Sequence, residues 1–206
     1  MNRLRWGELC SFCFFPCRLH KMTLRPQCLV FLFRRLQWGR ESGCVMTEVR
    51  NLEAGEKSPS FTAIDSDGNS WSSDDLASEG KSIILYFYPK DSTPGCTTQA
   101  CDFRDNMNRL SDEGYVVLGV SKDTGKSHGK FIQNQNLNFP LLMDEDLTIH
   151  HAFGAWREKQ NYGRTYMGCS RSTFVIDSNG ILSFARYNVK AKGHVEMLMR
   201  ELSING

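Results

Sequence analysis

The chain has 206 residues, of which 40% are hydrophobic and 23% are charged, and its formal net charge at pH 7 is +2. This length suits one domain with an appended segment, and the composition is that of a soluble globular protein. The charge is unevenly distributed. Residues 1–46 contain eight basic and two acidic side chains, whereas the rest contain 17 basic and 21 acidic ones. The larger part is thus mildly acidic, which argues against nucleic-acid binding on charge grounds.

The first 45 residues have a character of their own. They carry most of the excess positive charge, show little hydrophobic periodicity and hold five of the eight cysteines, at positions 10, 13, 17, 28 and 44. Their longest apolar run, Cys28–Phe33, is too short to cross a membrane. We therefore expect residues 1–45 to be a disordered, basic, cysteine-rich extension and residues 46–206 to form the domain.

Two interpretations of this extension are open. It is Arg-rich and poor in acidic residues, as organelle transit peptides are. Alternatively, translation starts at Met46, which we favour and which predicts a cytoplasmic protein. The spacing of Cys10, Cys13, Cys17 and His20 is that of zinc ligands. However, phenylalanines are interleaved with them and no second ligand group follows, so we expect no metal site.

In chain order, the domain is predicted to begin with a β-hairpin, a short helix and a buried strand. Phe61–Ile64 and the residues around Trp71 flank the turn-forming sequence Asp65-Ser66-Asp67-Gly68-Asn69, which predicts the hairpin. Ser73–Leu76 supplies an N-cap and early acidic residues for the short helix. Ile83–Tyr88 is apolar and rich in aromatic residues, which indicates a buried strand, and Pro89 ends it.

A longer helix is predicted from about Cys96 to Glu113, after a turn at Pro94-Gly95. Ala100, Phe103, Met107 and Leu110 recur at spacings of three and four residues, so one apolar face should pack against a sheet. Gly114 then ends the helix in the way that a C′ glycine does.

The second half of the domain alternates between strand and helix patterns. Tyr115–Val120 is nearly continuously apolar, as in a strand that is buried on both faces and parallel to its neighbour. A helix, a short extended piece, a short helix and a loop are then predicted at Lys126–Asn136, Phe139–Met143, Leu147–Phe153 and Trp156–Gly168. Two strands, Ser172–Ile176 and Ile181–Tyr187, flank the turn sequence Asp177-Ser178-Asn179-Gly180 and are predicted to form a hairpin, which a closing helix at Gly193–Leu202 follows. This order predicts a thioredoxin-like α/β fold, with a central mixed sheet flanked by helices and an N-terminal β-hairpin.

Cys96 is the strongest candidate for a catalytic residue. It falls in the first turn of a helix that begins at the carboxyl end of a central strand, where α/β sheets bind ligands. The positive end of the helix dipole and the free backbone N–H groups stabilise a thiolate there, and the thiolate is the reactive form of cysteine. A cysteine at a helix start is more often a small buried apolar residue, so the assignment depends on its neighbours.

Those neighbours carry a family resemblance. Pro89, Thr93 and Cys96 are spaced as P-x-x-x-T-x-x-C, which resembles the active-site signature of the peroxiredoxins. The run KDSTPGCTTQACDFRD is similar to the subgroup called bacterioferritin comigratory protein or peroxiredoxin Q. The resemblance extends from about Leu52 to the C-terminus and resumes at GAWREKQNYGRTYMG, RSTFVIDSNG and VKAKGHVE. It implies a thiol-dependent peroxidase without a cofactor, which reduces hydrogen peroxide and organic hydroperoxides in antioxidant defence.

The resemblance also implies a role for each site residue. Cys96 would be the peroxidatic cysteine, with Arg171 placed against its sulfur. Thr93 would hydrogen-bond the sulfur or the peroxide, and Pro89 would shape the pocket and exclude water. Cys101 would be the resolving cysteine. It would form a disulfide that thioredoxin or a similar dithiol protein reduces, with the protein acting as a monomer.

Helix geometry constrains this disulfide. Residues 96 and 101 of one helix differ by roughly 140° and about 7.5 Å along the axis, which places their Cα atoms about 9 Å apart. A disulfide spans at most about 7 Å between Cα atoms, so the first turns of the helix must unwind for the bond to form.

Three alternatives remain open. Cys101 could be a buried spectator. Cys169 stands where the subgroup usually has an apolar residue, and it is either a third redox participant or a small apolar substitution. The whole protein could be a non-enzymatic redox sensor or holdase on the same fold. The joint presence of Pro89, Thr93, Cys96 and Arg171 favours the enzyme, since a binding protein does not need all four.

Overall fold

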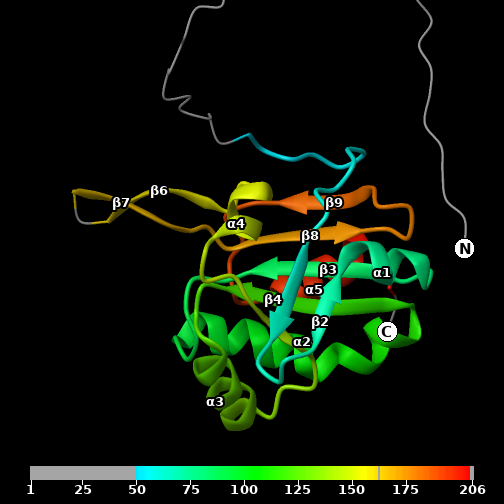
Figure 1. The fold of residues 1–206 in the computed structure, drawn as a ribbon, viewed down its shortest axis with the longest axis horizontal. Helices are drawn as coiled ribbons and strands as arrows, with labels where there is room; N and C mark the ends of the chain where they lie inside the picture. Colours follow the sequence, from blue (N-terminus) through cyan, green and yellow to red (C-terminus); the bar gives the residue numbers. More distant parts are fainter. Residues whose placement is uncertain (1–49, 162, 205–206) are drawn as a thin grey trace, which may run out of the picture. The chain divides into compact units, whose positions relative to one another are not determined.

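The computed structural model describes residues 50–161 and 163–204 of the chain (Figure 1). The predicted extension, with its cysteines and His20, lies outside the described residues. Within the described part, none of the helices is both long and apolar enough to cross a lipid bilayer.

A seven-stranded mixed sheet forms the centre of the domain, in the order β2-β1-β5-β4-β3-β8-β9 (Figure 1). Strands β3 and β4 pair in parallel, as do β4 and β5, and the other neighbours are antiparallel. The predicted parallel centre, N-terminal hairpin (β1–β2) and C-terminal hairpin (β8–β9) are therefore confirmed. The strands are β1 Thr62–Asp65, β2 Ser70–Ser72, β3 Ser82–Phe87, β4 Tyr115–Ser121, β5 Leu141–Met143, β8 Ser172–Ile176 and β9 Leu182–Arg186.

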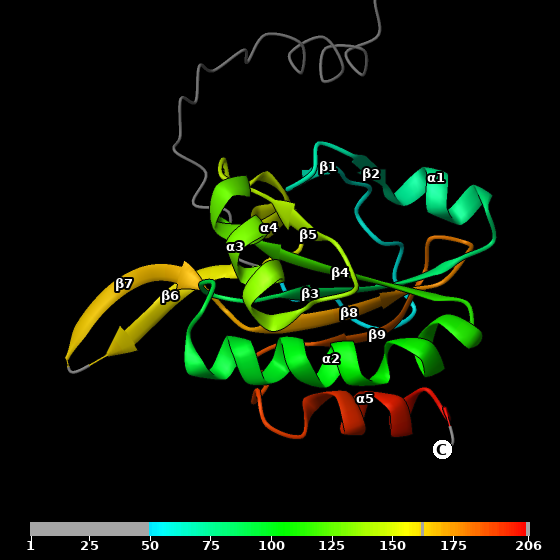
Figure 2. The ribbon, with the colours of Figure 1, turned by 90° about the horizontal axis from the view of Figure 1, so that it is seen from below.

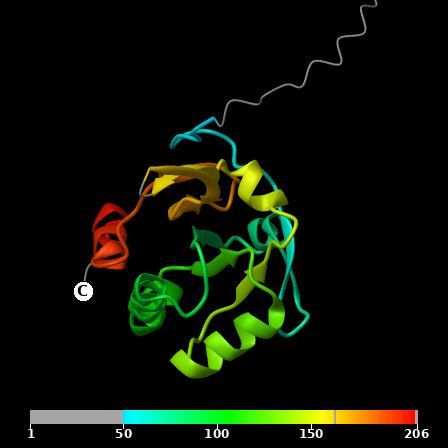
Figure 3. The ribbon, with the colours of Figure 1, turned by 90° about the vertical axis from the view of Figure 1, so that its left-hand side faces the viewer.

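Helices cover both faces of this sheet, and each face has its own apolar cluster. Helices α2, α3 and α5 contribute to one cluster, and α1 and α4 contribute to the other. Figures 2 and 3 show α2 and α5 side by side on the same face of the sheet. The helices are α1 Ser73–Ser78, α2 Pro94–Asp112, α3 Gly125–Gln135, α4 Thr148–Ala152 and α5 His194–Glu201.

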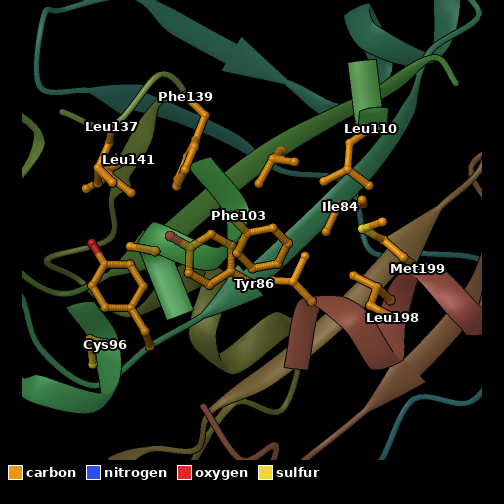
Figure 4. Packing of buried hydrophobic residues seen from close by; sticks show 14 of the residues in the cluster. Ile84, Tyr86, Cys96, Phe103, Leu110, Leu137, Phe139, Leu141, Leu198 and Met199 are labelled. Carbon is orange, nitrogen blue, oxygen red and sulfur yellow. The ribbon is translucent and has the colours of Figure 1, made fainter. Parts of the chain in front are cut away.

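Strand β3 is buried on both faces, which explains its continuous apolar sequence. Ile84 and Tyr86 belong to the cluster under α2, whereas Leu85 and Phe87 belong to the opposite one. Tyr86 stacks on Phe103 of α2 with ring centroids 4.6 Å apart (Figure 4). This packing fixes α2 against the strand whose carboxyl end precedes it.

A glycine on β4 makes room for that packing. A Cβ atom at Gly119 would lie 2.6 Å from Cδ2 of Leu141 and 2.8 Å from the hydroxyl oxygen of Tyr86. Both contacts are far inside van der Waals distance, so only glycine fits beside Tyr86. The apolar run Tyr115–Val120 is interrupted by glycine for this reason.

Two local predictions are wrong. Trp156–Gly168, predicted as a loop, forms a two-stranded hairpin of β6 (Trp156–Asn161) and β7 (Arg164–Cys169) that projects from the domain (Figures 1 and 2). Its strands pair only with each other, and Tyr166 and Met167 stay about half exposed. The sequence therefore lacks the apolar alternation that identifies a strand packed on a core.

The second wrong prediction concerns the start of α1. The N-cap is Ser72, whose hydroxyl accepts hydrogen bonds from the N–H groups of Asp74 and Asp75. Ser73, the predicted cap, instead accepts a 3.0 Å hydrogen bond from the N–H of Phe61. The helix thus begins one residue earlier than expected. Ser72 caps it, and the hydroxyl of Ser73 is instead bonded to the segment before β1.

Candidate active site

Cys96 is the third residue of α2 and lies just beyond the carboxyl end of β3. Pro94 occupies the first helical position, where its missing N–H costs nothing and its fixed φ suits the helix. Cys96 is only 2% exposed and belongs to the apolar cluster between α2 and the sheet. The predicted placement of this cysteine in the first helical turn is confirmed (Figure 4).

The topology of the sheet brings Arg171 to this cysteine. Strand β8 runs antiparallel to β3, with Ser172 opposite Phe87, so the residue before β8 lies beside the end of β3. Nη2 of Arg171 donates to Sγ of Cys96 at 3.3 Å. A guanidinium at hydrogen-bond distance favours the charged thiolate over the thiol.

Gly95 allows the arginine to come this close. A Cβ atom at this position would meet Nη2 of Arg171 at 3.4 Å, which is ordinary contact, but any atoms beyond it would compete with the guanidinium for space. We expect Gly95→Ala to retain the rate of Cys96 oxidation and Gly95→Val to lower it about tenfold, since small misplacements of catalytic groups are costly. Rapid-mixing measurements with peroxide test this pair. Equal rates in the two variants would show that space beside Arg171 is unimportant.

Thr93 and Pro89 belong to the loop between β3 and α2. Thr93 is the N-cap residue, but its hydroxyl donates to the carbonyl oxygen of Lys90 at 3.2 Å and makes no cap bond. Tyr88 still donates its N–H to the carbonyl of Val120, and the sheet hydrogen bonds stop at Pro89 as predicted. The contacts of Thr93 and Pro89 with a peroxide stay predictions.

A buried polar network, which the sequence analysis did not identify, holds this loop. The carboxylate of Asp91 accepts hydrogen bonds from the hydroxyls of Tyr88 and Ser127 at 2.8 and 2.7 Å, and its Oδ2 lies 3.0 Å from Nδ1 of His128. Burial acts to raise the pKa of Asp91, but the hydrogen bonds from His128, Ser127 and Tyr88 outweigh it and lower the pKa. The loop is therefore tied to α3 through an ionised carboxylate.

This network supports a strained residue. Ser92, directly after Asp91, has a φ of +57°, a left-handed conformation that costs a non-glycine residue roughly 1 kcal/mol or more. Such a conformation persists only where the surroundings fix it. The N–H of Asp91 also donates to Oδ2 of Asp123 at 2.8 Å, so the residue before Ser92 is held through both its backbone and its side chain. The loop thus presents Thr93 and Cys96 in one defined arrangement.

The other two cysteines of the described residues differ in environment. Cys101 is partly buried, and its thiol donates to Oε1 of Gln135 at the end of α3, at 3.7 Å. Cys169 is buried at the end of β7, and burial raises its pKa to about 12. All three cysteines are free. A thiol with so high a pKa stays protonated at neutral pH, which fits the interpretation of Cys169 as a small apolar substitution.

Gln99 is a further residue of the site that sequence reasoning missed. It lies one turn after Cys96 on α2, is completely buried, and its Oε1 accepts a hydrogen bond from Nη1 of Arg171. Its Nε2 lies 3.0 Å from Nδ1 of His194 at the start of α5. Both residues stand in the sequence runs that carry the family resemblance, which was the available signal.

These features define a class of protein. A thioredoxin-like sheet places one cysteine at a helix N-terminus, where the helix dipole and a guanidinium together favour a reactive thiolate. This arrangement is typical of enzymes that use thiol redox chemistry.

Comparison with known proteins identifies the family. The model of the AhpC/TSA family matches residues 54–185. Peroxiredoxin Bcp of Bacillus subtilis is 44% identical over 151 residues, which cover 73% of this chain and 95% of the relative. A solved structure of the bacterioferritin comigratory protein of Xanthomonas campestris is 36% identical, with a TM-score of 0.65 over 69% of this chain and 90% of that one. Xylella fastidiosa PrxQ is 31% identical, with a TM-score of 0.70 over 75% and 97%.

The chain belongs to the AhpC/TSA family and within it resembles the Bcp and PrxQ peroxiredoxins. It is a thiol peroxidase, an oxidoreductase that reduces peroxides with electrons from a thiol reductant. The predictions of family, fold class and enzyme activity are confirmed. The alternative of a non-enzymatic redox sensor or holdase is thereby set aside.

Proposed function

We propose that Cys96 is the peroxidatic cysteine and that it reduces both hydrogen peroxide and organic hydroperoxides. The observation that carries the proposal is the 3.3 Å contact between Nη2 of Arg171 and Sγ of Cys96. The thiolate attacks one peroxide oxygen, the O–O bond breaks, and an S–O bond forms. The sulfur is oxidised to a sulfenic acid, while the other oxygen leaves with its electron pair and takes a proton to become water or an alcohol.

The remaining chemistry returns the sulfur to its reduced state. The Cys101 thiol gives up its proton, its sulfur attacks the Cys96 sulfur, and an S–S bond forms as the S–O bond breaks. The departing hydroxide takes up a proton and leaves as water. A dithiol protein then reduces this disulfide and becomes a disulfide itself. We assign thioredoxin as this reductant. Since both cysteines lie in one chain, the cycle can be completed within a monomer.

The substrate class draws support from one relative. The structure of the Xanthomonas campestris protein was described in connection with alkyl peroxide reduction, which favours organic hydroperoxides here as well. A cytoplasmic location is part of the same proposal, and it depends on translation starting at Met46.

Chemical trapping of the first intermediate tests the assignment of Cys96. One equivalent of hydrogen peroxide is added together with dimedone, which reacts with sulfenic acids, to the Cys101→Ser variant, where no disulfide with Cys101 can form. The labelled peptides are mapped by mass spectrometry. We expect the label on the peptide that contains Cys96 and little on Cys169, because burial keeps the latter protonated. Labelling mainly at Cys169 would contradict the proposal. Blocking with an alkylating agent beforehand serves as the control.

A further inference from the structure

The first residue of α5 is connected to the reactive cysteine through two side chains. Arg171 donates through Nη2 to the sulfur of Cys96 and through Nη1 to Oε1 of Gln99. The amide nitrogen of Gln99 lies 3.0 Å from Nδ1 of His194. Gln99 and His194 are 0% and 1% exposed, so water does not compete for these bonds. A continuous chain of hydrogen bonds thus runs from α5 to the sulfur.

Only one assignment of donors and acceptors satisfies every hydrogen bond between His194, Gln99 and Arg171. A guanidinium can only donate, so the Gln99 atom that faces Arg171 must be its carbonyl oxygen. The NH₂ group of Gln99 therefore faces His194, and Nδ1 of His194 must accept from it. The imidazole is then neutral and carries its proton on Nε2. Burial, followed by the charges of Arg171 and Arg186, lowers the pKa of His194 to about 4, in agreement with a neutral ring.

We propose that His194 is a positioning residue for peroxide reduction: by accepting from the Gln99 amide, it fixes the orientation in which Gln99 holds Arg171 against Cys96. A flipped amide would turn its NH₂ group toward the guanidinium, and two donors would face each other. The acceptor at Nδ1 makes the productive orientation the only satisfied one. This inference rests on the proposed role of Cys96 and adds α5 to the residues that organise its site.

The competing explanation is that His194 only fills space. Its ring packs edge-on against Phe103, with centroids 5.8 Å apart and an interplanar angle of 79°. Its Nε2 atom has no hydrogen-bond partner among the residues that the structure describes. An experiment must therefore separate the acceptor from the ring, and two substitutions of nearly equal size do so. In His194→Asn, Oδ1 is as many bonds from the backbone as Nδ1 of histidine, whereas His194→Leu has an apolar carbon there.

We expect His194→Leu to lower the second-order rate constant for Cys96 oxidation about tenfold, because a displaced guanidinium no longer matches the reacting sulfur. His194→Asn should stay within about threefold of the parent, since it keeps the acceptor. Both rates are measured by rapid mixing with hydrogen peroxide, and the thiolate fraction at neutral pH by ultraviolet absorbance. Thermal unfolding midpoints show whether the two variants are comparably folded.

A double substitution makes the test independent of stability. In a Gln99→Met background the connection is already cut, so His194→Leu should lower the rate no further. If Asn and Leu at position 194 react at the same rate, or if Leu is equally harmful in the Gln99→Met background, the positioning role is wrong. The Cys101→Ser variant, in which no disulfide can remove the sulfenic acid, is treated with dimedone in parallel. An absence of label on Cys96 in that variant would instead overturn the proposed function, and the inference with it.

Discussion

Replacing Arg171 by methionine is expected to lower the rate constant for Cys96 oxidation by about a thousandfold, because a donor aimed at the reacting atoms is commonly worth 10²–10³ in rate. The guanidinium lies 3.3 Å from the sulfur and is the cation nearest to it among the contacts of the described residues. Without it, the sulfur loses its charged hydrogen-bond donor, and the developing charge on the leaving oxygen is no longer stabilised. Rapid mixing with peroxide, in a protein with Cys96 as its sole cysteine, measures the loss in rate.

Lysine at the same position separates charge from geometry. Arg171 uses one nitrogen for Cys96 and the other for Gln99, and a single ammonium cannot reproduce this planar pair of donors. Arg171→Lys should therefore recover only part of the loss and remain roughly a hundredfold slower than the parent. Arg164→Met is the matched control, since it removes the same charge from an exposed position on β7. If Arg171→Met reacts with peroxide within twofold of the parent rate, the contact between Arg171 and Cys96 does not contribute to catalysis.

The sequence was sufficient to predict the parts of the fold that depend on hydrophobic pattern. Ile83–Tyr88 could be recognised as a central strand because both faces of β3 are buried. Ala100, Phe103 and Leu110 of α2 are buried as their spacing indicated, and Gly114 follows the helix with a φ of +79°. The projecting β6–β7 hairpin could not be predicted in this way, because its strands pair only with each other and contact the core only at their base, through Trp156 and Cys169.

The site was predictable where a residue acts through local sequence, and less so where it acts through tertiary contacts. The placement of Cys96 follows from a strand, a turn and a helix that are adjacent in the chain. Gln99 meets His194 across 95 positions, and Asp91 meets His128 across 37. No sequence spacing identifies either pair, because the partners are brought together only by the tertiary fold. Sequence reasoning therefore singled out Cys96 and Arg171, which the structure brings into contact, but not the side chains that hold them.

Cys101 is expected to be needed for regeneration of Cys96 but not for its oxidation. Cys101→Ser should leave the first oxidation of Cys96 almost unchanged, because Arg171, Gln99 and the loop remain in place. Turnover with thioredoxin should fall at least a hundredfold, since the reductant acts on a disulfide that can no longer form within the chain. The persistent sulfenic acid should then proceed to sulfinic acid under excess peroxide. Mass spectrometry of the Cys96 peptide and a coupled turnover assay measure these outcomes.

The contacts of α2 define what the parent must break to form that disulfide. Cys96 faces Arg171, whereas Cys101 donates to Gln135 on α3, and the helix separates their Cα atoms by about 9 Å. Oxidation of the parent should therefore lower helicity and raise amide exchange from about Cys96 to Arg104, and Cys101→Ser should abolish both changes. Cys169→Ala is the control and should turn over like the parent. A mapped Cys96–Cys169 bond would instead make Cys169 the resolving residue, and a dimer linked through Cys96 would make resolution intermolecular.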